Sequence, residues 1–332
     1  MRTERLLIPI LFHPTNVLIL DDQPEVLSSI SQMIDINTPY VTETNPNQAL
    51  SYLRSHTYRR NALSELLVQR GFDVNESEVA ESFQLTLPRL LTFLKSFEHY
   101  KKVGVALIDR QMASRDGLEL CQEIQEDGLL VAHGLFTAQT TSEEVVDAFN
   151  RGDIDFYLPK KGLTPEKLNA CISEASWKFF ITLSEVLTGL IAHELKPLYD
   201  EQHFKIFKKV CQQHNTVEFC LWDSSGSFLL LKAEGQAQQF FVRNEADFTD
   251  CYEIAKNNEA PYEVLQALRG RQQFPYTKNA LGYLKLQGDQ WDDAMISMEK
   301  VPGREWCYAV VDRPDIEAFS FKRYFHEVWP KP

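Results

Sequence analysis

One short stretch, Val103 to Gly117, constrains the fold of this 332-residue chain more than any other. An apolar run ends abruptly in one carboxylate, Asp109, and a glycine-containing turn and a helical pattern follow it. A short apolar run bounded by turn signals is typical of a strand buried on both faces of a parallel sheet. In open α/β sheets, ligands bind outside the carboxyl ends of the strands. The pattern therefore predicts that Asp109 lies at a ligand-binding edge, with a solvated loop aspartate as the alternative.

Similar apolar runs recur along the first half of the chain, and a helical pattern follows each of them. The predicted strands are Asn16–Leu20, Tyr40–Thr44, Leu129–Phe136 and Ile154–Leu158. Strands that alternate with helices of about 10 to 15 residues indicate βαβ units and a parallel sheet. Because crossovers in such sheets are almost always right-handed, the strand ends should share one rim. That rim then holds Asp21, Asp22, Asp109, Thr137 and Lys160.

This set of rim residues resembles the receiver domain of two-component response regulators, over roughly residues 16–172. That family has an acidic pair after strand one, an acceptor aspartate after strand three, a threonine after strand four and a lysine after strand five. Tyr157 matches the switch aromatic of the family, and Asp116-Gly117 matches its turn after the acceptor. Ala113 departs from the proline that the family usually has there, which affects loop rigidity rather than chemistry. The resemblance implies a doubly wound, five-stranded parallel sheet with the flavodoxin-like order 2-1-3-4-5.

The residue types on the rim suit phosphoryl transfer assisted by Mg²⁺. Crowded carboxylates repel one another unless a cation lies between them, and Mg²⁺ prefers oxygen ligands in an octahedral shell. We expect Asp21, Asp22 and Asp109 to be its ligands, and the resemblance adds the backbone carbonyl of Gln111. Asp109 would act as the carboxylate nucleophile and phosphoacceptor. Lys160 would offset the charge on the transferring oxygens.

The resemblance also implies a switch and a set of partners. Thr137 would hydrogen-bond to the aspartyl phosphate, and its inward movement would free space for Tyr157 to rotate. The donor would be a sensor histidine kinase or a phosphotransfer protein. The expected function is that of a response regulator whose phosphorylation switches dimerisation, a C-terminal output domain, or both.

An insertion at about residues 58–101 distinguishes this chain from an ordinary receiver. Some 40 extra residues lie between Thr57 and Lys101, and their apolar spacing predicts two helices, forming a hairpin. A structural extension and a partner-docking surface are the alternative interpretations. The apolar positions are Leu63, Leu66, Leu67, Val79, Phe83, Leu87, Leu90, Leu91 and Leu94.

The last receiver helix is predicted to continue beyond the receiver domain (1–172) as a linker helix (173–197). Apolar residues at gaps of three and four run from Pro165 until Pro197, which a helix interior tolerates poorly. A helix of about 30 residues spans about 45 Å and outruns the receiver, so part of its apolar stripe needs another surface. The alternatives are a coiled pairing in a homodimer and a kink near Gly189 that folds the second half onto the output domain.

One motif in this linker looks like the phosphoacceptor box of histidine kinases. It reads Ala192-His-Glu-Leu-Lys-Pro197. The polar residue that the box carries before proline is missing, and no glycine-rich ATP lid follows it. We interpret the match as coincidence.

Residues 198–332 are predicted to form an α+β output domain with an antiparallel sheet. Val217–Trp222 and Ser227–Leu231 flank a turn with Gly226 and predict a β-hairpin. This layout is similar to PAS-like modules, and the whole chain is similar to quorum-sensing response regulators of the Lqs type. His203 and His214 have no carboxylate at metal spacing. An output domain that binds a protein or small ligand is thus favoured over one that hydrolyses nucleotides, and we expect no enzyme activity beyond the receiver chemistry.

Composition narrows the class of protein and its compartment. With 44% hydrophobic and 24% charged residues, the chain has the balance of a globular protein of about two domains. A formal net charge of −13 without a block of Lys and Arg disfavours nucleic acid as a partner. The six scattered cysteines form no C-x-x-C pair, which indicates reduced thiols in the cytoplasm. Leu6–Phe12 is apolar but too short to span a membrane, so we expect a packed N-terminal arm.

Overall fold

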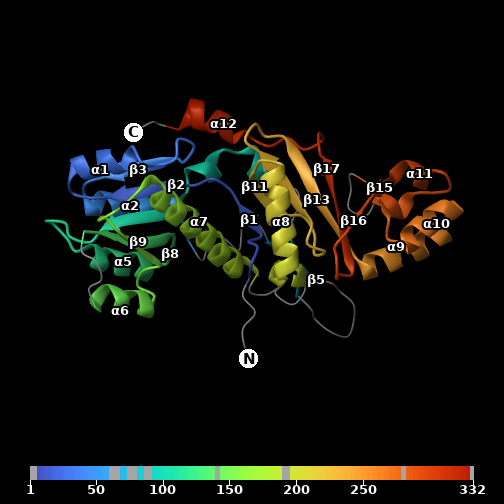
Figure 1. Ribbon diagram of the computed structural model, residues 1–332, viewed down its shortest axis with the longest axis horizontal. Helices are drawn as coiled ribbons and strands as arrows, with labels where there is room; N and C mark the ends of the chain where they lie inside the picture. The colour runs from blue at the N-terminus through green and yellow to red at the C-terminus, as the bar shows by residue number, and fades with distance from the viewer. Residues whose placement is uncertain are drawn as a thin grey trace.

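The computed structural model describes seven segments of the chain, and all statements below concern those residues. They are 6–59, 68–72, 81–85, 92–138, 143–188, 195–277 and 282–329. Figure 1 shows one sheet with its helices at one end and a second sheet in the middle. At the other end is a lobe that contains α9 (Glu245–Asn257), α10 (Tyr262–Arg269) and α11 (Gln290–Ala294). No helix in these segments is long and apolar enough to cross a membrane.

The first sheet is the predicted five-stranded parallel sheet. Its strand order is β10-β9-β7-β2-β3, which is the order 2-1-3-4-5 followed from the opposite edge. The strands are β2 (Asn16–Leu20), β3 (Tyr40–Glu43), β7 (Val103–Asp109), β9 (Ala132–Thr137) and β10 (Phe156–Pro159). Every residue of β2, β7 and β9 is buried, as expected for strands covered on both faces.

Helices cover both faces of this sheet, and the alternation of buried residues along the strands shows which face each helix covers. The helices are α1 (Pro24–Ser31), α2 (Pro46–His56), α5 (Gly117–Glu126), α6 (Glu143–Arg151) and α7 (Pro165–Thr188). Val17 and Ile19 of β2 pack in one core with α1 and α7. Leu18 and Leu20 pack in another core with α2, α5 and α6. The predicted doubly wound α/β fold is therefore confirmed.

Two described segments of the insertion, 68–72 and 81–85, form strands where the sequence predicted helices. β4 (Tyr58–Arg59) pairs with β8 (Leu129–Leu130), and β5 (Val68–Phe72) pairs antiparallel with β6 (Glu81–Leu85). Among the described residues of the insertion, 92–95 are helical and Glu98–Lys101 form the 3-10 helix η1. A spacing of four residues, as from Val79 to Phe83, fits a period of two as well as one of 3.6, so the pattern also allowed strands. Leu63, Leu66, Leu67, Val79, Leu87, Leu90 and Leu91 lie outside the described residues.

The apolar stripe of α7 is buried within the chain as far as Leu183, whereas Val186 is 38% exposed. Its first half packs under the receiver sheet through Leu168 and Ile172, and its second half places Phe180 and Leu183 in the same core as the second domain. The helix is described as far as Thr188. This part of the stripe therefore has its partner surface within the chain, while Leu190 and the predicted kink near Gly189 lie outside the described residues. Pro197 lies in a separate 3-10 helix, η2 (Lys196–Tyr199).

The N-terminal arm packs as predicted, but it joins the second domain. β1 (Leu11–Phe12) pairs antiparallel with β11 (Thr216–Leu221), with Leu11 opposite Cys220. The backbone N–H of Leu7 donates to the carbonyl oxygen of Leu198 at 3.0 Å. The predicted receiver boundary of 1–172 therefore places this arm in the wrong sheet. A strand of two residues leaves no periodic signal in the sequence from which its partner could be inferred.

The second domain is built on a six-stranded antiparallel sheet of order β1-β11-β12-β13-β17-β16. Its remaining strands are β12 (Phe228–Lys232), β13 (Ala237–Asn244), β16 (Glu299–Lys300) and β17 (Trp306–Asp312). The predicted hairpin is β11–β12. Its turn contains Gly226 at φ +88°, where an added Cβ would lie 2.6 Å from the Cβ of Pro197. The antiparallel α+β class is confirmed, and the PAS-like interpretation stays a prediction.

The helix α8 lies against this sheet, and α9, α10 and α11 form a lobe beside it (Figure 1). The elements are α8 (Glu201–Gln213), α9 (Glu245–Asn257), α10 (Tyr262–Arg269), β14 (Gln273–Pro275), η3 (Gly282–Lys285), α11 (Gln290–Ala294), β15 (Met295–Ser297), α12 (Phe321–Arg323) and the π-helix η4 (Tyr324–Val328). The lobe has its own core around the fully buried Trp291. β15 pairs antiparallel with β14 in this lobe and lies outside the main sheet.

A buried carboxylate joins the second domain to the receiver. Glu218 on β11 is 1% exposed, and its Oε2 accepts a hydrogen bond of 2.7 Å from the hydroxyl of Tyr100 in η1. Its Oε1 lies 3.4 Å from Nε2 of His99. Burial, together with the nearby Glu218 charge, raises the pKa of Tyr100, so the phenol keeps the proton that it donates.

We predict that Tyr100→Phe lowers the free energy of unfolding by about 1–3 kcal/mol. The substitution removes a donor from a carboxylate that water cannot reach, and an unsatisfied buried acceptor costs about that much. Chemical denaturation followed by circular dichroism measures the change. Tyr262→Phe is the control, since Tyr262 is 69% exposed. Equal unfolding free energies for both variants would contradict a stabilising role for this hydrogen bond.

Candidate functional site

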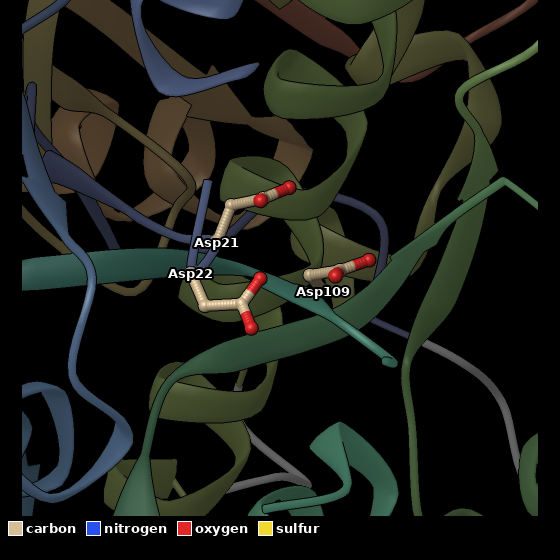
Figure 2. Close-up of side chains that lie close together, drawn as sticks. All are labelled: Asp21, Asp22 and Asp109. Atoms are coloured by element: carbon tan, nitrogen blue, oxygen red, sulfur yellow. The ribbon is translucent and has the colours of Figure 1, made fainter. Parts of the chain in front are cut away.

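The carboxyl edge of the parallel sheet brings three aspartates together. Asp21 and Asp22 directly follow β2, and Asp109 is the last residue of β7, the neighbouring strand. Figure 2 shows the three carboxylates gathered around one region. One oxygen from each lies within 4.8 Å of the other two. Among the described residues, this is the group of acidic, His or Cys side chains placed to hold a metal ion.

Lys160 offsets part of this negative charge. Its Nζ lies 2.6 Å from Oδ2 of Asp21 and 2.8 Å from Oδ1 of Asp109. The loop that carries it is held to the neighbouring strand, since the Lys160 N–H donates to the carbonyl oxygen of Thr137 at 2.7 Å. The ammonium also lies 5.0 Å from the centre of the Phe136 ring, a cation–π contact that the sequence did not indicate.

Asp21 and Asp22 are held by backbone donors. Oδ1 of Asp21 accepts from the N–H of Gln23 at 3.0 Å. Oδ2 of Asp22 accepts from the N–H of Ala113 at 2.7 Å, across the loop that follows the acceptor strand. The proline usual at this place in receivers has no N–H and could not make this bond. Ala113 therefore ties its loop to the acidic pair by a hydrogen bond, where proline would restrain it by its ring.

The turn after Asp109 depends on glycine. The N–H of Gly117 donates to the carbonyl oxygen of Arg110 at 2.8 Å. A Cβ at residue 117 would lie only 2.1 Å from the backbone oxygen of Asp109, so any other side chain would displace the acceptor. Asp116 then caps α5, because its carboxylate accepts from the N–H of Leu118 at 2.7 Å. The predicted Asp116-Gly117 turn is thus part of the support for the site.

Burial raises the pKa of the Asp109 carboxyl above its ordinary value. The hydrogen bond and the charge of Lys160 act in the opposite direction, and the charges of Asp21 and Asp22 add to the rise. Asp109 is only 4% exposed. A carboxylate with so little water around it is a stronger nucleophile than one in solution, provided that cations compensate its charge.

The remaining predicted site residues lie around this centre at different depths. Thr137 ends β9 and is 2% exposed, whereas Tyr157 on the edge strand β10 is 39% exposed. Gln111 lies two residues beyond the acceptor and forms an isolated β-bridge with Asp116. An ion pair between Arg110 and Glu144 of α6 was missed, because nothing in the sequence relates two charges 34 positions apart.

The strand order and the rim residues together define a receiver domain fold, as predicted. No protein-family model and no curated protein matches the chain. Among solved structures, the chain is similar to the response regulator LqsR of Legionella pneumophila, with a TM-score of 0.76 and 21% identity over 98% of this chain and 97% of that one. The two chains therefore share one fold over their whole length, and the predicted resemblance to the Lqs type is confirmed for the fold.

Two isolated receiver domains also match about half of the chain. The receiver domain of the Francisella response regulator 1452 has 13% identity and a TM-score of 0.32, and covers 49% of this chain and 98% of that one. A CheY-like receiver domain protein from Methanospirillum hungatei JF-1 has 15% identity and a TM-score of 0.33, and covers 50% and 96%.

We predict that Mg²⁺ binds weakly at Asp21, Asp22 and Asp109, and that Asp22→Ala lowers its affinity at least about tenfold. Mg²⁺ wants oxygen ligands, and the substitution removes the most accessible of the three carboxylates. A titration followed by amide NMR shifts near residues 21–23 and 109–113 measures the affinity. Asp250→Ala, which removes an exposed carboxylate of the second domain, is the control. An equal response of wild type and Asp22→Ala would contradict the metal site.

Proposed function

We propose that this protein is a response regulator of a two-component phosphorelay and that Asp109 is its phosphoacceptor. The observation that carries the proposal is the meeting of three carboxylates and the Lys160 ammonium at the carboxyl edge of a receiver-fold sheet. The fold shared with LqsR over the whole chain supports it. The proposed donor is a sensor histidine kinase or a phosphotransfer protein, and the proposed compartment is the cytoplasm.

The acidic residues fit Mg²⁺ as the cofactor. Their donor atoms are all carboxylate oxygens close enough to share one small ion, which is the ligand type that Mg²⁺ prefers. Asp21, Asp22 and Asp109 would hold it, and the receiver resemblance adds the backbone carbonyl of Gln111. When bound, Mg²⁺ supplies positive charge that stabilises the transferring phosphoryl group.

The chain's own residues account for the rest of the transfer. An oxygen of Asp109 attacks the phosphorus of the donor, the bond between phosphorus and the donor's leaving atom breaks, and an aspartyl phosphate forms. Lys160, already 2.8 Å from Asp109, compensates the charge on the transferring oxygens without having to reorganise. The near-complete burial of Asp109 limits competing attack by water.

The proposed switch connects this site to an exposed apolar surface. Thr137 ends the strand next to Asp109, and Tyr157 lies on the adjoining edge strand, with Leu135 as its backbone partner. Val146 and Phe149 of α6 are 44% and 49% exposed, so α6 presents apolar side chains to solvent. Inward movement of Thr137 and rotation of Tyr157 would change this face, which we propose as the surface of a homodimer.

The proposed output is the binding of a protein or small ligand by the second domain. That domain packs on the receiver through α7, β1 and Glu218, so a change in the receiver can reach it without domain separation. A role in quorum sensing stays a prediction from the resemblance to the Lqs type.

We predict that Lys160→Ala slows phosphorylation of Asp109 by about 10²–10³, because it removes a preorganised positive charge from the transfer site. Incorporation of phosphate from acetyl phosphate, followed by Phos-tag electrophoresis, measures the rate. Lys161→Ala is the matched control, since Lys161 is the exposed neighbour of Lys160 in the same loop. A melting temperature lowered by several degrees with phosphorylation unchanged would show that Lys160 is structural only.

We predict that beryllofluoride with Mg²⁺ shifts the protein from monomer toward dimer and that Asp109→Asn does not respond. A phosphoryl group adds about −1.5 to −2 charge and strong acceptor oxygens beside Thr137 and Lys160. A coupling of about 1–3 kcal/mol raises dimer affinity about five- to 150-fold. Sedimentation velocity at several concentrations measures it. Dimer affinity that is the same with and without the analogue would mean that phosphorylation acts within one chain.

A further inference from the structure

A buried acid and a buried base meet where the receiver joins the second domain. Glu218 lies on β11 of the second sheet, His99 lies in η1, and both side chains are 1% exposed. Oε1 of Glu218 lies 3.4 Å from Nε2 of His99. Among the described residues, neither of these atoms has a hydrogen-bond partner, nor does Nδ1 of His99. The pairing of these two groups therefore decides what charge the contact carries.

The titratable side chains packed around this pair are uncharged at neutral pH. Burial lowers the pKa of His13 well below its ordinary value, and the charge of His99, whose ring centre lies 4.8 Å away, adds to this effect. Burial raises the pKa of Tyr58, whose hydroxyl lies 3.5 Å from Nε2 of His13. The other neighbours with a pKa raised by burial lie in η1, in η4 and on β11: Tyr100, Tyr324 and Cys220. None of these groups carries a positive charge that could balance Glu218.

The charged side chains of the surrounding elements do not balance Glu218 either. In the described part of the chain, His99 is the base within ion-pair distance of this carboxylate. Nζ of Lys102 lies 5.3 Å from the centre of the Tyr58 ring, and Lys232 ends β12 opposite Thr216. The ion pairs of the neighbouring elements are exposed and formed with other residues: Lys101 with Glu98, Lys95 with Glu317, Lys322 with Glu234 and Arg323 with Glu327.

The burial of this pair determines how many protons it holds. Removing a charge from water is strongly unfavourable unless an opposite charge lies beside it. Without a proton the pair would carry a net negative charge, and with two protons it would carry a net positive one, so it is neutral with one. The hydroxyl of Tyr100 donates to Oε2 of Glu218 at 2.7 Å, which favours the carboxylate form. The single proton therefore belongs on the ring of His99.

We propose that His99 and Glu218 make the contact between receiver and second domain proton-dependent: the contact takes up one proton on His99 and weakens when that proton is lost. A histidine in water releases its proton at about pH 6.5. At pH 7.5 the separated groups therefore mostly hold no proton, whereas the packed pair holds one. Because lower pH favours the state that binds more protons, the contact is strongest below about pH 6.5 and weakens as the pH rises above it. This response does not involve Asp109.

Chemical denaturation of the full-length protein at about pH 6.5, 7.5 and 8.5 tests the proposal. Glu218→Gln keeps a group of the same shape whose neutral amide needs no proton on His99. Relative to this variant, the folding equilibrium constant of the wild type should fall about three- to tenfold for each pH unit. Glu201→Gln, which removes an exposed carboxylate of α8, is the matched control and should keep the wild-type response. A response in Glu218→Gln that equals or exceeds that of the wild type would overturn the proposal.

Nitrogen NMR of the wild type keeps the proposal testable if Glu218→Gln does not fold. Both ring nitrogens of an imidazolium carry a proton and have similar chemical shifts, whereas the two nitrogens of a neutral ring differ widely. We expect the imidazolium pattern for His99 at pH 7.5. A neutral His99 ring at pH 6.5 would show that the pair does not hold its proton there and would contradict the proposal.

Hydrogen exchange locates the response within the chain. After correction for the intrinsic exchange rate, the amides of η1 and β11 should lose protection relative to those of β2 as the pH rises from about 6.5 to 8.5. Glu218→Gln should not show this difference. A uniform change along the chain would mean that the proton does not act at the domain contact, and the assignment would fail. Asp109→Asn should respond like the wild type, so failure of the phosphoacceptor proposal would leave this result unchanged.

Discussion

The burial of the apolar stripe of α7 is the constraint that determines how this molecule is put together. The helix starts just after the loop with Lys160 and packs against β7, β9 and the N-terminal strand β1. The same stripe thus covers one face of the receiver sheet and supports the first strand of the second sheet. Since one continuous core includes residues of both domains, separating them would expose much of that core to water. Signals between the domains therefore have to pass through packed contacts.

The site brings several negative charges together at the carboxyl edge of the parallel sheet. The strands β2 and β7 are buried throughout, and their charged residues come at the carboxyl ends: Asp109 ends β7, and Asp21 and Asp22 follow β2. There, Lys160 bridges Asp21 and Asp109, while burial still raises the pKa of Asp109. One ammonium offsets only part of the charge of three carboxylates, so additional positive charge at this site is favourable. This property suits both metal binding and phosphoryl transfer.

The sequence allowed the site to be predicted better than the parts around it. Each rim residue follows a short apolar run, and the rules for parallel sheets then determine which edge it occupies, as for Asp109 and Lys160. The β5–β6 hairpin escaped prediction because a spacing of four residues fits both a helix and a strand. The pairing of β1 with β11 and the bond from Ala113 to Asp22 are contacts between distant segments, and short-range patterns carry no information about them.

The position of Glu218 bears on how a change at Asp109 could reach the second domain. Its partners His99 and Tyr100 lie in η1, which comes shortly before β7, so the buried contact and the acceptor lie toward opposite ends of one strand. A buried carboxylate whose donor moves away loses far more than an exposed one, because water cannot replace the donor. Even a small shift of β7 would thus alter the stability of the domain contact. Because of this asymmetry, a displacement of the donors at this contact would cost more free energy than the same displacement at an exposed carboxylate.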